Sequence, residues 1–540
     1  MFYSTIADSF MLELPRFGSA KKETNRQDDE TYKQYYKLNR EDSADTERTK
    51  EVEPTFPSLD KMMEQSIGTF GLAQLVQAVL VAFSSFFDSQ QTFISIFTDA
   101  HPKWHCTNDS ICNSDSNICQ LPKSAWAWDG PSTMVSEWDL GCAGSFITGL
   151  PASAYFMGSL LGGFFLATIA DSSIGRKKFL FLSCLAMAVT TALTAFSTNI
   201  WVYSVLRFIS GVGRVPIGTC NIVLLTEKVG KEWRGRVGVM EELLFTLGFL
   251  SLPGVAYINR GSSWRSLYLW TSIPTLIYCL IIQFFVSESP RWLFTEGRYE
   301  EAIKVLKTIS PSMDNPMLSL YPLDNRVLTR KTSNTNPSSM IRKLFKKKWA
   351  LQRIVALLIP GFCIGLGYFG MALGLGNLDM NLYLSVTYNA ALEIPSSFLT
   401  FLMIEKWSRK GSLFTLCFLS GISGIMTTVA GNGAIQMGLE LVSFFCACTA
   451  YNVILIYTVE LFPTCVRNFA MTAVRQTLIF GAMFGPVLVA SWRNNELLSY
   501  RVFGALLLFS GFFIVRLPET KGMSLADTLD EQEHNDNMVV

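Results

Sequence analysis

The chain alternates between long apolar runs and short polar segments, and one longer polar segment divides the runs into two groups. Six apolar runs precede residues 287–350 and six follow them. A helix needs about 20 mostly apolar residues to cross the hydrocarbon of a bilayer, and soluble core helices are rarely that long. The pattern therefore predicts an all-α integral membrane protein with twelve transmembrane helices in two six-helix bundles. The predicted spans are 74–97, 146–170, 179–197, 200–226, 237–258, 267–286, 354–373, 382–404, 413–430, 438–459, 471–490 and 502–515.

The distribution of charge sets the domain boundaries. A net charge of +1 and 16% charged residues would suit many soluble proteins, but here the charges concentrate in residues 1–65 and 287–350. Two half-domains joined by a linker predict a transporter with its substrate site between the halves. The expected units are a disordered cytoplasmic tail (1–65), a first bundle (66–286) containing a long loop (98–142), a cytoplasmic linker (287–350), a second bundle (351–516) and a cytoplasmic tail (517–540).

The loop at 98–142 carries signs of an oxidising compartment. It contains four of the 12 cysteines, and Asn108 begins an N-glycosylation sequon. Four cysteines allow three disulfide pairings, with free surface thiols as the alternative. Together these features indicate a lumenal or extracellular loop. The disulfide candidates are Cys106, Cys112, Cys119 and Cys142.

Basic residues give an independent indication of orientation. Lys and Arg gather in alternate connections, including 176–178, 228–236 and 406–410, whereas the opposite connections have few. Cytoplasmic loops hold most of the Lys and Arg near the ends of spans. Both termini and the linker are therefore expected in the cytoplasm.

Acidic and basic residues recur at equivalent places in the two halves. Asp171 precedes Arg176 after the second span, and Glu405 precedes Arg409 after the eighth. Such charges can lock one conformation and loosen in another, or the basic residues could only set the topology. The repetition favours a gating charge network. Its further expected members are Glu227, Arg236, Glu288, Arg291, Glu460 and Arg467.

Several short motifs follow one another along the chain in a specific order and spacing. They are Ser136-Glu137-Trp138-Asp139-Leu140, Glu288-Ser289-Pro290-Arg291-Trp292-Leu293, Asn381-Leu382-Tyr383-Leu384, Glu460-Leu461-Phe462-Pro463-Thr464 and Pro518-Glu519-Thr520-Lys521-Gly522. Together they resemble the organic cation/carnitine transporter family of the major facilitator superfamily (MFS), most closely its plant-type members. The resemblance covers about residues 65–532 and implies the MFS fold, two pseudo-symmetric bundles that transport by alternating access. Ser408 departs from the family pattern, because a Gly is usual there.

Two charged residues inside spans are candidates for coupling. Charges within a membrane are costly and usually functional. Asp88 lies in the middle of the first span and Arg207 near the outer end of the fourth. They resemble the acid and the Arg that form a coupling pair in proton-coupled sugar porters of the superfamily. We expect Asp88 and Arg207 to pair and to couple transport to protons, with a static ion pair as the alternative.

Candidate substrate contacts also follow from the resemblance. Glu393, two residues before Pro395, resembles an acid that the family places on the cavity wall, where a carboxylate can bind an ammonium group. Arg475 stands one turn before Ile479, the position at which animal relatives carry an Asp. An acid with an Arg suits a zwitterion such as carnitine; a structural pairing of Arg475 with Glu460 or another cavity acid is the alternative. The other candidates are Gln90, Tyr368, Tyr383, Tyr451 and Asn452.

The tyrosines among these candidates could bind a cation through their ring faces, or they could serve in packing or as interfacial anchors. Glu241 and Glu242 begin the fifth span, close to the cytoplasmic edge, and are assigned no transport role.

These observations predict a secondary transporter for a small organic cation or zwitterion in the vacuolar or plasma membrane, with protons as coupling partners. The alternatives are a carrier for an organic anion or a sugar-like solute, and a sensor derived from a transporter. None of the three histidines lies in a span, and no Gly-rich phosphate-binding loop occurs. These absences argue against a membrane enzyme, a metal site and ATP-driven transport. No cofactor and no nucleic-acid partner are expected.

Overall fold

The structure is a computed structural model in which most of the chain beyond residue 66 is described. The tail expected over 1–65 lies outside the described residues, as do Asn108 and Asp171. The described residues are 67, 70–107, 112, 118–130, 132–169, 174–309, 337–378, 380–491, 497–522, 526 and 528–539.

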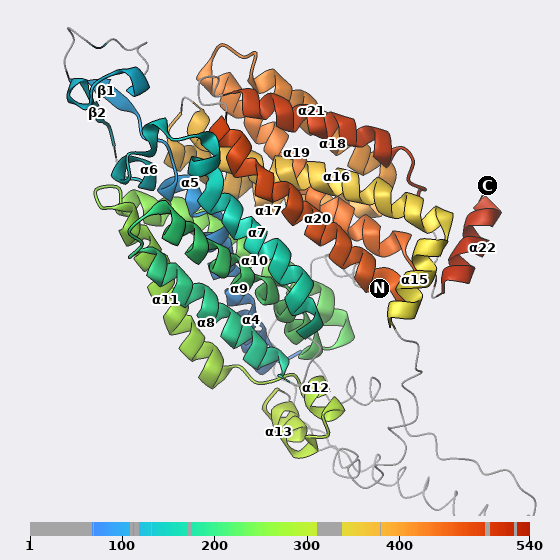
Figure 1. The fold of residues 1–540 in the computed structure, drawn as a ribbon. Helices are drawn as coiled ribbons and strands as arrows, with labels where there is room; N and C mark the ends of the chain where they lie inside the picture. The colour runs from blue at the N-terminus through green and yellow to red at the C-terminus, as the bar shows by residue number, and fades with distance from the viewer. Residues whose placement is uncertain are drawn as a thin grey trace, which may run out of the picture.

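Long helices form two bundles that lie side by side (Figure 1). The first bundle comprises α4 (Leu72–Phe93) with its short continuation α5 (Ser95–Thr98), α7 (Ser145–Ile169), α8 (Arg176–Thr194), α9 (Ile200–Glu227), α10 (Arg234–Ile258) and α11 (Trp264–Phe285). The second comprises α16 (Lys348–Leu373), continued by the 3₁₀ turn η7 (Gly374–Asn377), then α17 (Leu382–Lys406), α18 (Arg409–Thr427), α19 (Gly433–Leu461), α20 (Thr464–Ser491) and α21 (Leu498–Ile514).

The helices match the predicted spans in number and order. Among the described residues, eight helices are long and apolar enough to cross a membrane, and α21 is a shorter apolar helix of 17 residues. The helices α7, α17 and α18, with 25, 25 and 19 residues, complete a twelve-helix arrangement. The chain therefore has the predicted all-α membrane fold.

Several helices begin earlier than their apolar runs. The prediction started the fifth, tenth and eleventh spans at residues 237, 438 and 471, whereas α10 begins at Arg234, α19 at Gly433 and α20 at Thr464. Backbone hydrogen bonds and caps decide where a helix begins, and polar residues can extend it past the apolar stretch into water. Five of the described bundle helices start with a capping side chain that accepts backbone N–H groups. These caps are Asn199, Ser263, Asn381, Ser408 and Asn432.

One packing contact is repeated in both bundles. A Cβ atom on Gly248 of α10 would lie 2.1 Å from the carbonyl oxygen of Phe86 on α4. A Cβ atom on Gly481 of α20 would lie 2.2 Å from the carbonyl oxygen of Phe362 on α16. The first and fifth helices of each bundle thus approach so closely that only glycine fits, as expected for helices packed within lipid.

One end of the bundles, the loop end, carries the long loop after α5. This loop forms a small antiparallel ladder between β1 (Trp104–Cys106) and β2 (Trp126–Trp128), with Trp104 opposite Trp128. The short helix α6 (Met134–Glu137) follows. Glu137 accepts hydrogen bonds from Trp264 (2.7 Å) and from Arg265 (2.6 Å to its Nη2), which fix the loop to the start of α11.

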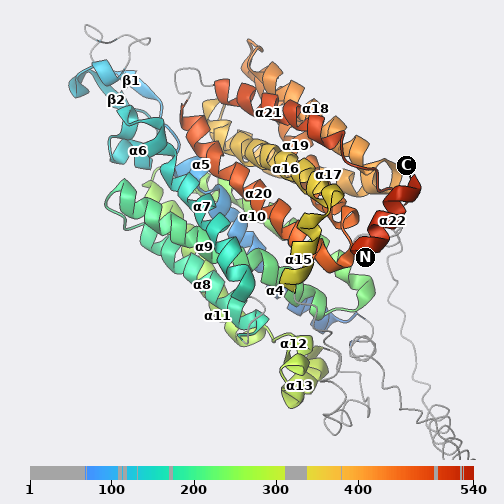
Figure 2. The ribbon, with the colours of Figure 1, turned by 45° about the vertical axis from the view of Figure 1, so that its right-hand side comes forward.

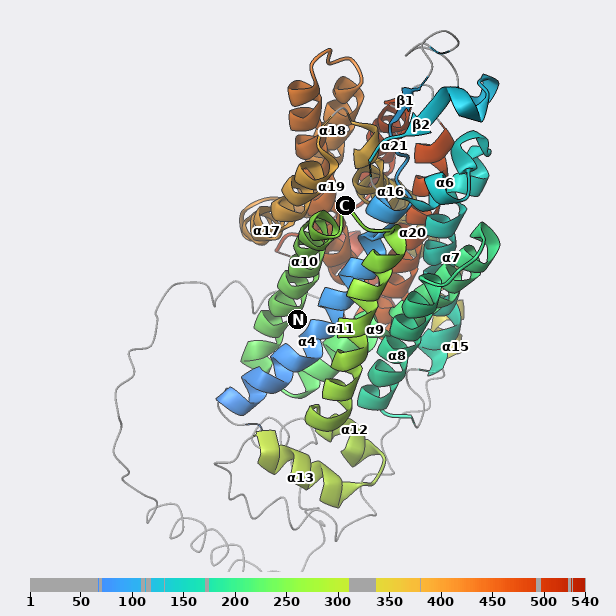
Figure 3. The same ribbon diagram turned by 90° about the vertical axis from the view of Figure 1, so that its left-hand side faces the viewer.

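The opposite end, the linker end, carries the polar segment that separates the bundles. The described parts of this segment include the helices α12 (Pro290–Thr295), α13 (Tyr299–Ile309) and α15 (Pro337–Lys346). Figure 3 shows β1 and β2 at one end of the molecule and α12 and α13 at the other. Ile67, Trp292, Leu293, Phe294, Ala302 and Leu306 form a small separate core that holds α12 and α13 against the start of the first bundle.

The C-terminal helix α22 (Leu529–Val539) lies at the same end of the second bundle as α15 (Figure 2), where it meets the residue that follows α15. Lys347 Nζ donates to Asp530 Oδ1 (2.6 Å) and to Glu533 Oε2 (2.5 Å). These hydrogen bonds raise the pKa of Lys347, and the same contact lowers the pKa of Asp530. Ion pairs thus hold the C-terminal helix α22 against the segment that leads into the second bundle.

Candidate functional site

Asp88 forms an ion pair in the middle of the first bundle. Arg214 on α9 donates from Nε to Asp88 Oδ1 and from Nη2 to Asp88 Oδ2, both at 2.8 Å. The Asp88 residue is 5% exposed. A two-point Arg–carboxylate contact is among the strongest polar contacts in proteins. The carboxylate of Asp88 therefore has an internal counter-charge.

The expected pairing of Asp88 with Arg207 is not formed. Arg207 Nη2 donates to Ser95 Oγ (3.0 Å), both terminal nitrogens donate to the carbonyl oxygen of Gln91 (3.2 Å), and the guanidinium lies 4.3 Å from the ring centre of Tyr155. Arg207 and Arg214 are two turns apart on one face of α9, about 10 Å along its axis.

Glu393 lies halfway along α17 and is 3% exposed. Its carboxylate accepts hydrogen bonds from the phenol of Tyr368 on α16 and from the hydroxyl of Thr246 on α10 (3.1 Å). The Thr246 contact joins the two bundles. Among the described residues, no Lys, Arg or His lies within ion-pair distance of Glu393. Unlike Asp88, Glu393 is held only by neutral partners.

Glu241 and Glu242 lie within α10 and not at its start, where the sequence analysis placed them; Glu241 is half-buried and Glu242 is exposed. Because α10 begins at Arg234, Glu241 is already two turns into the helix. Its carboxylate accepts a hydrogen bond from Ser85 Oγ (2.6 Å), and Ser85 in turn accepts one from Asn221 (2.7 Å). Glu242 interacts electrostatically with Glu393. The sequence prediction missed this placement because it started the fifth span at Val237, where the apolar run begins.

Arg475 on α20 faces these acids from the second bundle. It interacts electrostatically with Glu241, Glu242 and Tyr451. Within the described part of the chain it makes no hydrogen bond or close ion pair, so its expected alternative pairing with Glu460 is not formed. Four carboxyl groups (Asp88, Glu241, Glu242 and Glu393) thus surround this region with two guanidinium groups (Arg214 and Arg475).

Aromatic rings line the same region from both bundles. Tyr368 lies 5.3 Å from Tyr451 and 6.4 Å from Phe93 of α4, measured between ring centres. Asn452 follows Tyr451 on α19 and is half-buried. The structure therefore brings Tyr368, Tyr451 and Glu393 together, as the sequence interpretation assumed.

Two other expected contact residues lie elsewhere. Gln90 is buried and donates to Ser251 on α10 (2.8 Å), so its side chain is held within the first bundle. Tyr383 lies at the loop end, where it stacks on Phe97 (5.6 Å) and meets Tyr257 edge-on (5.5 Å). Tyr383 thus helps to close the bundles against each other at the loop end, away from Glu393.

The charges at the linker end follow one plan in both bundles. In the first, Glu288 accepts the backbone N–H of Lys177 (2.8 Å), at the start of α8, and Ser289 donates to Glu227 (2.5 Å). In the second, Glu519 accepts the backbone N–H of Arg409 (2.8 Å), at the start of α18. Thr520 donates to Glu460 (2.7 Å). An acid at a helix N-terminus is stabilised by the free N–H groups there.

Each of these linker-end networks lies within its own bundle. Arg409 pairs with Glu460 (3.0 Å), both in the second bundle. Of the other expected members, Glu288 lies at the start of α8, and the Arg236 guanidinium lies 4.3 Å from the ring centre of Trp233. The sequence signal for this plan was a Glu followed by Ser or Thr after the last span of each half.

The remaining expected gating residues have the following places. Arg176 begins α8, Arg291 lies on α12, and Arg467 on α20 donates from Nε to the carbonyl oxygen of Phe462 (3.3 Å). Glu405 lies on α17, but its side chain, like Asp171, is outside the described residues.

A buried lysine lies beside the first network. Lys228, just beyond the end of α9, is 0% exposed and donates to Gln77 Oε1 (2.8 Å). Gln77 Oε1 also accepts the backbone N–H (3.0 Å) and the hydroxyl (3.1 Å) of Ser287. Burial lowers the pKa of Lys228 to about 7, although the nearby Glu288 opposes this shift and Lys177 adds to it.

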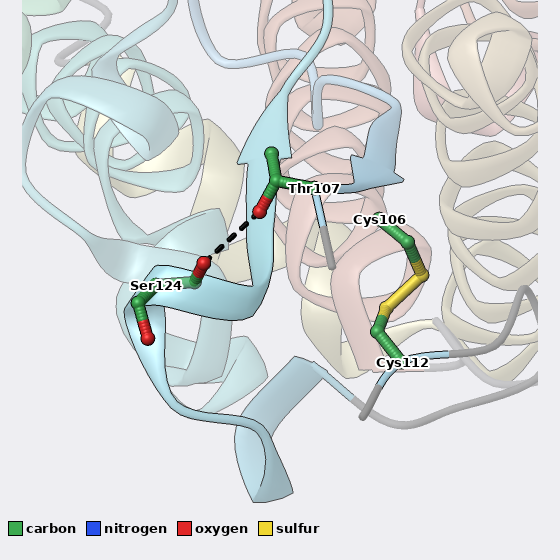
Figure 4. Close-up of a disulfide and its surroundings, with 4 residues drawn as sticks. All are labelled: Cys106, Thr107, Cys112 and Ser124. Carbon is green, nitrogen blue, oxygen red and sulfur yellow. Dashed lines mark hydrogen bonds between the residues drawn. A yellow bond between two sulfur atoms is a disulfide. The ribbon is translucent and has the colours of Figure 1, made fainter. Parts of the chain in front are cut away.

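The four loop cysteines form two disulfides, which settles the pairing that the sequence left open. Cys106 is bonded to Cys112, and Cys119 to Cys142. Figure 4 shows the Cys106–Cys112 bond beside the hydrogen bond from Thr107 to the carbonyl oxygen of Ser124 (3.0 Å). The second disulfide ties the loop to the segment that leads into α7.

Two bundles of membrane-spanning helices, with charged and aromatic residues buried between them, define a membrane transport protein of the MFS type. Residues 81–530 match the family described as "Sugar (and other) transporter". Among solved structures, the inward-open xylose transporter XylE from E. coli has the same fold. It superimposes with a TM-score of 0.59 at 17% identity, covering 85% of this chain and 98% of that one.

Proteins of similar sequence identify the family of transporters to which the chain belongs. Organic cation/carnitine transporter 2 from Arabidopsis thaliana is 52% identical over 498 residues, covering 89% of this chain and 94% of the relative. Organic cation/carnitine transporter 5 from the same plant is 43% identical, covering 89% and 94%. Mouse solute carrier family 22 member 3 is 30% identical, covering 74% and 72%. The chain belongs to the organic cation/carnitine transporter family, a family of secondary transporters and not of enzymes.

Proposed function

We propose that this transporter carries a small organic cation, or a zwitterion such as carnitine, and that the solute's ammonium group binds at Glu393. The observation that carries the proposal is the contrast in partners: Asp88 has a guanidinium, whereas the partners of Glu393 among the described residues are the hydroxyl groups of Tyr368 and Thr246. A buried carboxylate without a cation is costly. An ammonium group arriving from outside would provide the missing charge.

The surroundings of Glu393 support a cationic solute. Glu242 is close enough to interact electrostatically with Glu393, so the acids of this region outnumber its two Arg residues. Tyr368 and Tyr451 lie beside each other, with ring centres 5.3 Å apart and planes tilted by 39°, and offer ring faces for cation–π contact. The printed names of the plant relatives, organic cation/carnitine transporters, agree with this chemistry.

Arg475 is the proposed partner of a carboxylate on the solute. It faces Glu241 and Glu242 without a close ion pair among the described residues. A zwitterion could therefore place its ammonium at Glu393 and its carboxylate at Arg475. A bare cation would use Glu393 alone. Arg475 is therefore the residue that would distinguish a zwitterion from a bare cation.

Proton coupling is proposed for Asp88, with Arg214 in the role that the sequence analysis gave to Arg207. Both residues belong to the first bundle, so rocking of the bundles does not by itself separate them. The second bundle nevertheless reaches this pair, because Tyr451 interacts electrostatically with Arg214. Movement of α19 would change the field at the pair and hence the tendency of Asp88 to bind a proton.

Two features of the chain indicate its orientation in the membrane. Disulfides in the long loop favour an oxidising compartment on that side, and the basic residues favour the cytoplasm for the linker end. We place both termini in the cytoplasm and the protein in the vacuolar or plasma membrane.

A counterflow experiment in proteoliposomes tests the function. Vesicles preloaded with unlabelled tetraethylammonium, carnitine, an organic anion or glucose are diluted into labelled solute of the same kind at two pH values. Exchange of the cation or carnitine is expected, and Glu393→Gln should reduce it. Exchange of the anion or sugar alone would reject the role of Glu393, and a lack of exchange of every solute would favour a sensor.

A further inference from the structure

A second buried carboxyl group lies inside the second bundle, outside the region around Glu393. Glu440 on α19 and Asn389 on α17 are both 0% exposed. Asn389 Nδ2 donates to Glu440 Oε2 (3.0 Å) and to the carbonyl oxygen of Ser385 (3.3 Å). Both amide hydrogens of Asn389 are therefore used.

One oxygen atom on each partner lacks a donor. Glu440 Oε1 and Asn389 Oδ1 are buried and accept no hydrogen bond within the described part of the chain. No Lys, Arg or His among those residues lies within 4.0 Å of Glu440. From α21, Tyr500 interacts electrostatically with Glu440, and its hydroxyl donates to the carbonyl oxygen of Met371 (3.4 Å). An ionised carboxylate here would have one amide contact and no counter-charge, which membrane interiors disfavour.

We infer that Glu440 binds a resident proton on Oε1 and forms a two-hydrogen-bond acid–amide pair with Asn389. In this pair, Glu440 Oε1–H donates to Asn389 Oδ1 while Asn389 Nδ2–H donates to Glu440 Oε2. One proton thus satisfies both acceptors that lack a donor and removes the buried charge. The existing bond between Nδ2 and Oε2 already sets the carboxyl and amide groups beside each other.

The pair has a positioning role for the transport site. Asn389 precedes Glu393 by four residues, so the two lie one turn apart on the same face of α17. A bond from this face to α19 fixes the rotation of α17 and hence the direction in which Glu393 points. This second step rests on the proposed function, whereas the assignment of the proton does not.

Infrared spectroscopy of the purified full-length protein in lipid nanodiscs tests the proton directly. Glu440→Gln is the matched variant, because its neutral amide can donate to Asn389 Oδ1 and accept from Nδ2. We expect the wild type to show the C=O stretching band of a protonated carboxylic acid, shifted in D2O and absent from Glu440→Gln. The band should persist from mildly acidic to mildly alkaline pH. Loss of carboxylate bands in the variant, or titration of the acid band within that range, would overturn the inference.

Thermal unfolding provides a second readout that needs no solute. Glu440→Gln should unfold at the wild-type temperature. Glu440→Leu and Asn389→Leu should each unfold earlier, because each leaves a buried polar partner unpaired, and the double Leu variant should recover part of the loss. Failure of Glu440→Gln to fold, while the double Leu variant folds, would contradict the inference.

Uptake measurements test the positioning role. Glu440→Gln should keep the wild-type KM for a cation, whereas Asn389→Leu should raise KM several-fold with an unchanged pH profile. An unchanged KM in Asn389→Leu would refute the positioning role. If the wild type exchanged no solute at all, the proposed function would fail while the infrared result on Glu440 would stand.

Discussion

The two bundles treat their buried carboxyl groups differently, although their backbones repeat. In the first, Asp88 is held at two points by Arg214. In the second, Glu393 has two hydroxyl partners. The linker-end networks, by contrast, are alike in both bundles, with Glu288 and Glu519 at the starts of α8 and α18. We therefore expect the repeated networks to serve the conformational change of both halves, and the differing carboxyl groups to serve the solute and its coupling.

The largest effect is expected from Asp88→Asn. This change leaves the buried guanidinium of Arg214 without its counter-charge, and breaking one side of a buried pair costs about 3–5 kcal/mol. Initial uptake rates in proteoliposomes should fall by roughly 100-fold or more, and the remaining activity should lose its pH dependence.

Two comparisons test this assignment of partners. Asp129→Asn makes the same chemical change in the loop, where the side chain is 50% exposed, and should have little effect. The double variant Asp88→Asn with Arg214→Gln should regain thermal stability, because no unpaired charge remains. Equal recovery with Arg207→Gln in place of Arg214→Gln would contradict the pairing seen in the structure.

The second effect is expected from Glu393→Gln. A hydrogen bond to a charged group contributes about 1.5–3 kcal/mol, so the KM for a cation should rise by roughly 10- to 100-fold. Thermal stability should change little, because Gln can still meet the hydroxyls of Tyr368 and Thr246. Transport assays and thermal unfolding on the same preparation give the two values.

Thr246→Val is the control, since it removes one hydrogen bond to Glu393 and no charge. Its effect on KM should be only a few-fold. A loss of stability in Glu393→Gln as large as that in Asp88→Asn would mean that the two bundles do not differ as described.

Arg475→Gln should separate zwitterions from bare cations. The variant lacks the proposed partner of a carboxylate, so carnitine uptake should lose roughly 10-fold in KM. Tetraethylammonium has no carboxylate and should bind with a KM near the wild-type value. The ratio of the two KM values is therefore the measurement, and an equal change in both would remove Arg475 from solute recognition.

The fold could be predicted from the sequence because a bilayer requires long apolar helices, and those are visible as runs. The site was harder to predict. Asp88 and Glu393 could be found, since a carboxyl group within an apolar run is conspicuous. The partner of Asp88 depends on the relative depth of two helices, which hydropathy does not define; hence Arg207 was selected and Arg214 was missed.

Two further misses have the same physical origin. Glu241 seemed to mark the edge of the fifth span because polar residues near its start looked like the end of the membrane segment, whereas α10 begins at Arg234. Tyr383 belongs to a recognisable motif, but only the contact with Phe97 places it at the loop end. The positions of Glu241 and Tyr383 both depend on contacts between helices, and the pattern of residues along the chain does not show those contacts.

The smallest expected effect on transport concerns Lys228, whose burial should act mainly on the pH dependence of stability. In the unfolded chain a lysine keeps its proton up to about pH 10, whereas Lys228 in the folded protein has a pKa of about 7 because it is buried. Between these values unfolding takes up a proton, so stability should rise with pH from about 7 to about 10, by at most about 1.4 kcal/mol per pH unit.

Lys228→Met should be more stable than the wild type near neutral pH and should lack this rise. Lys231→Met, at an exposed position nearby, should keep it. A wild-type unfolding temperature that falls over this range would have the wrong sign for a buried lysine, and the charge would then have to be compensated by Glu288. Because the second bundle has Leu461 after Glu460, where the first has Lys228 after Glu227, any pH response found here distinguishes the two linker-end networks that otherwise follow one plan.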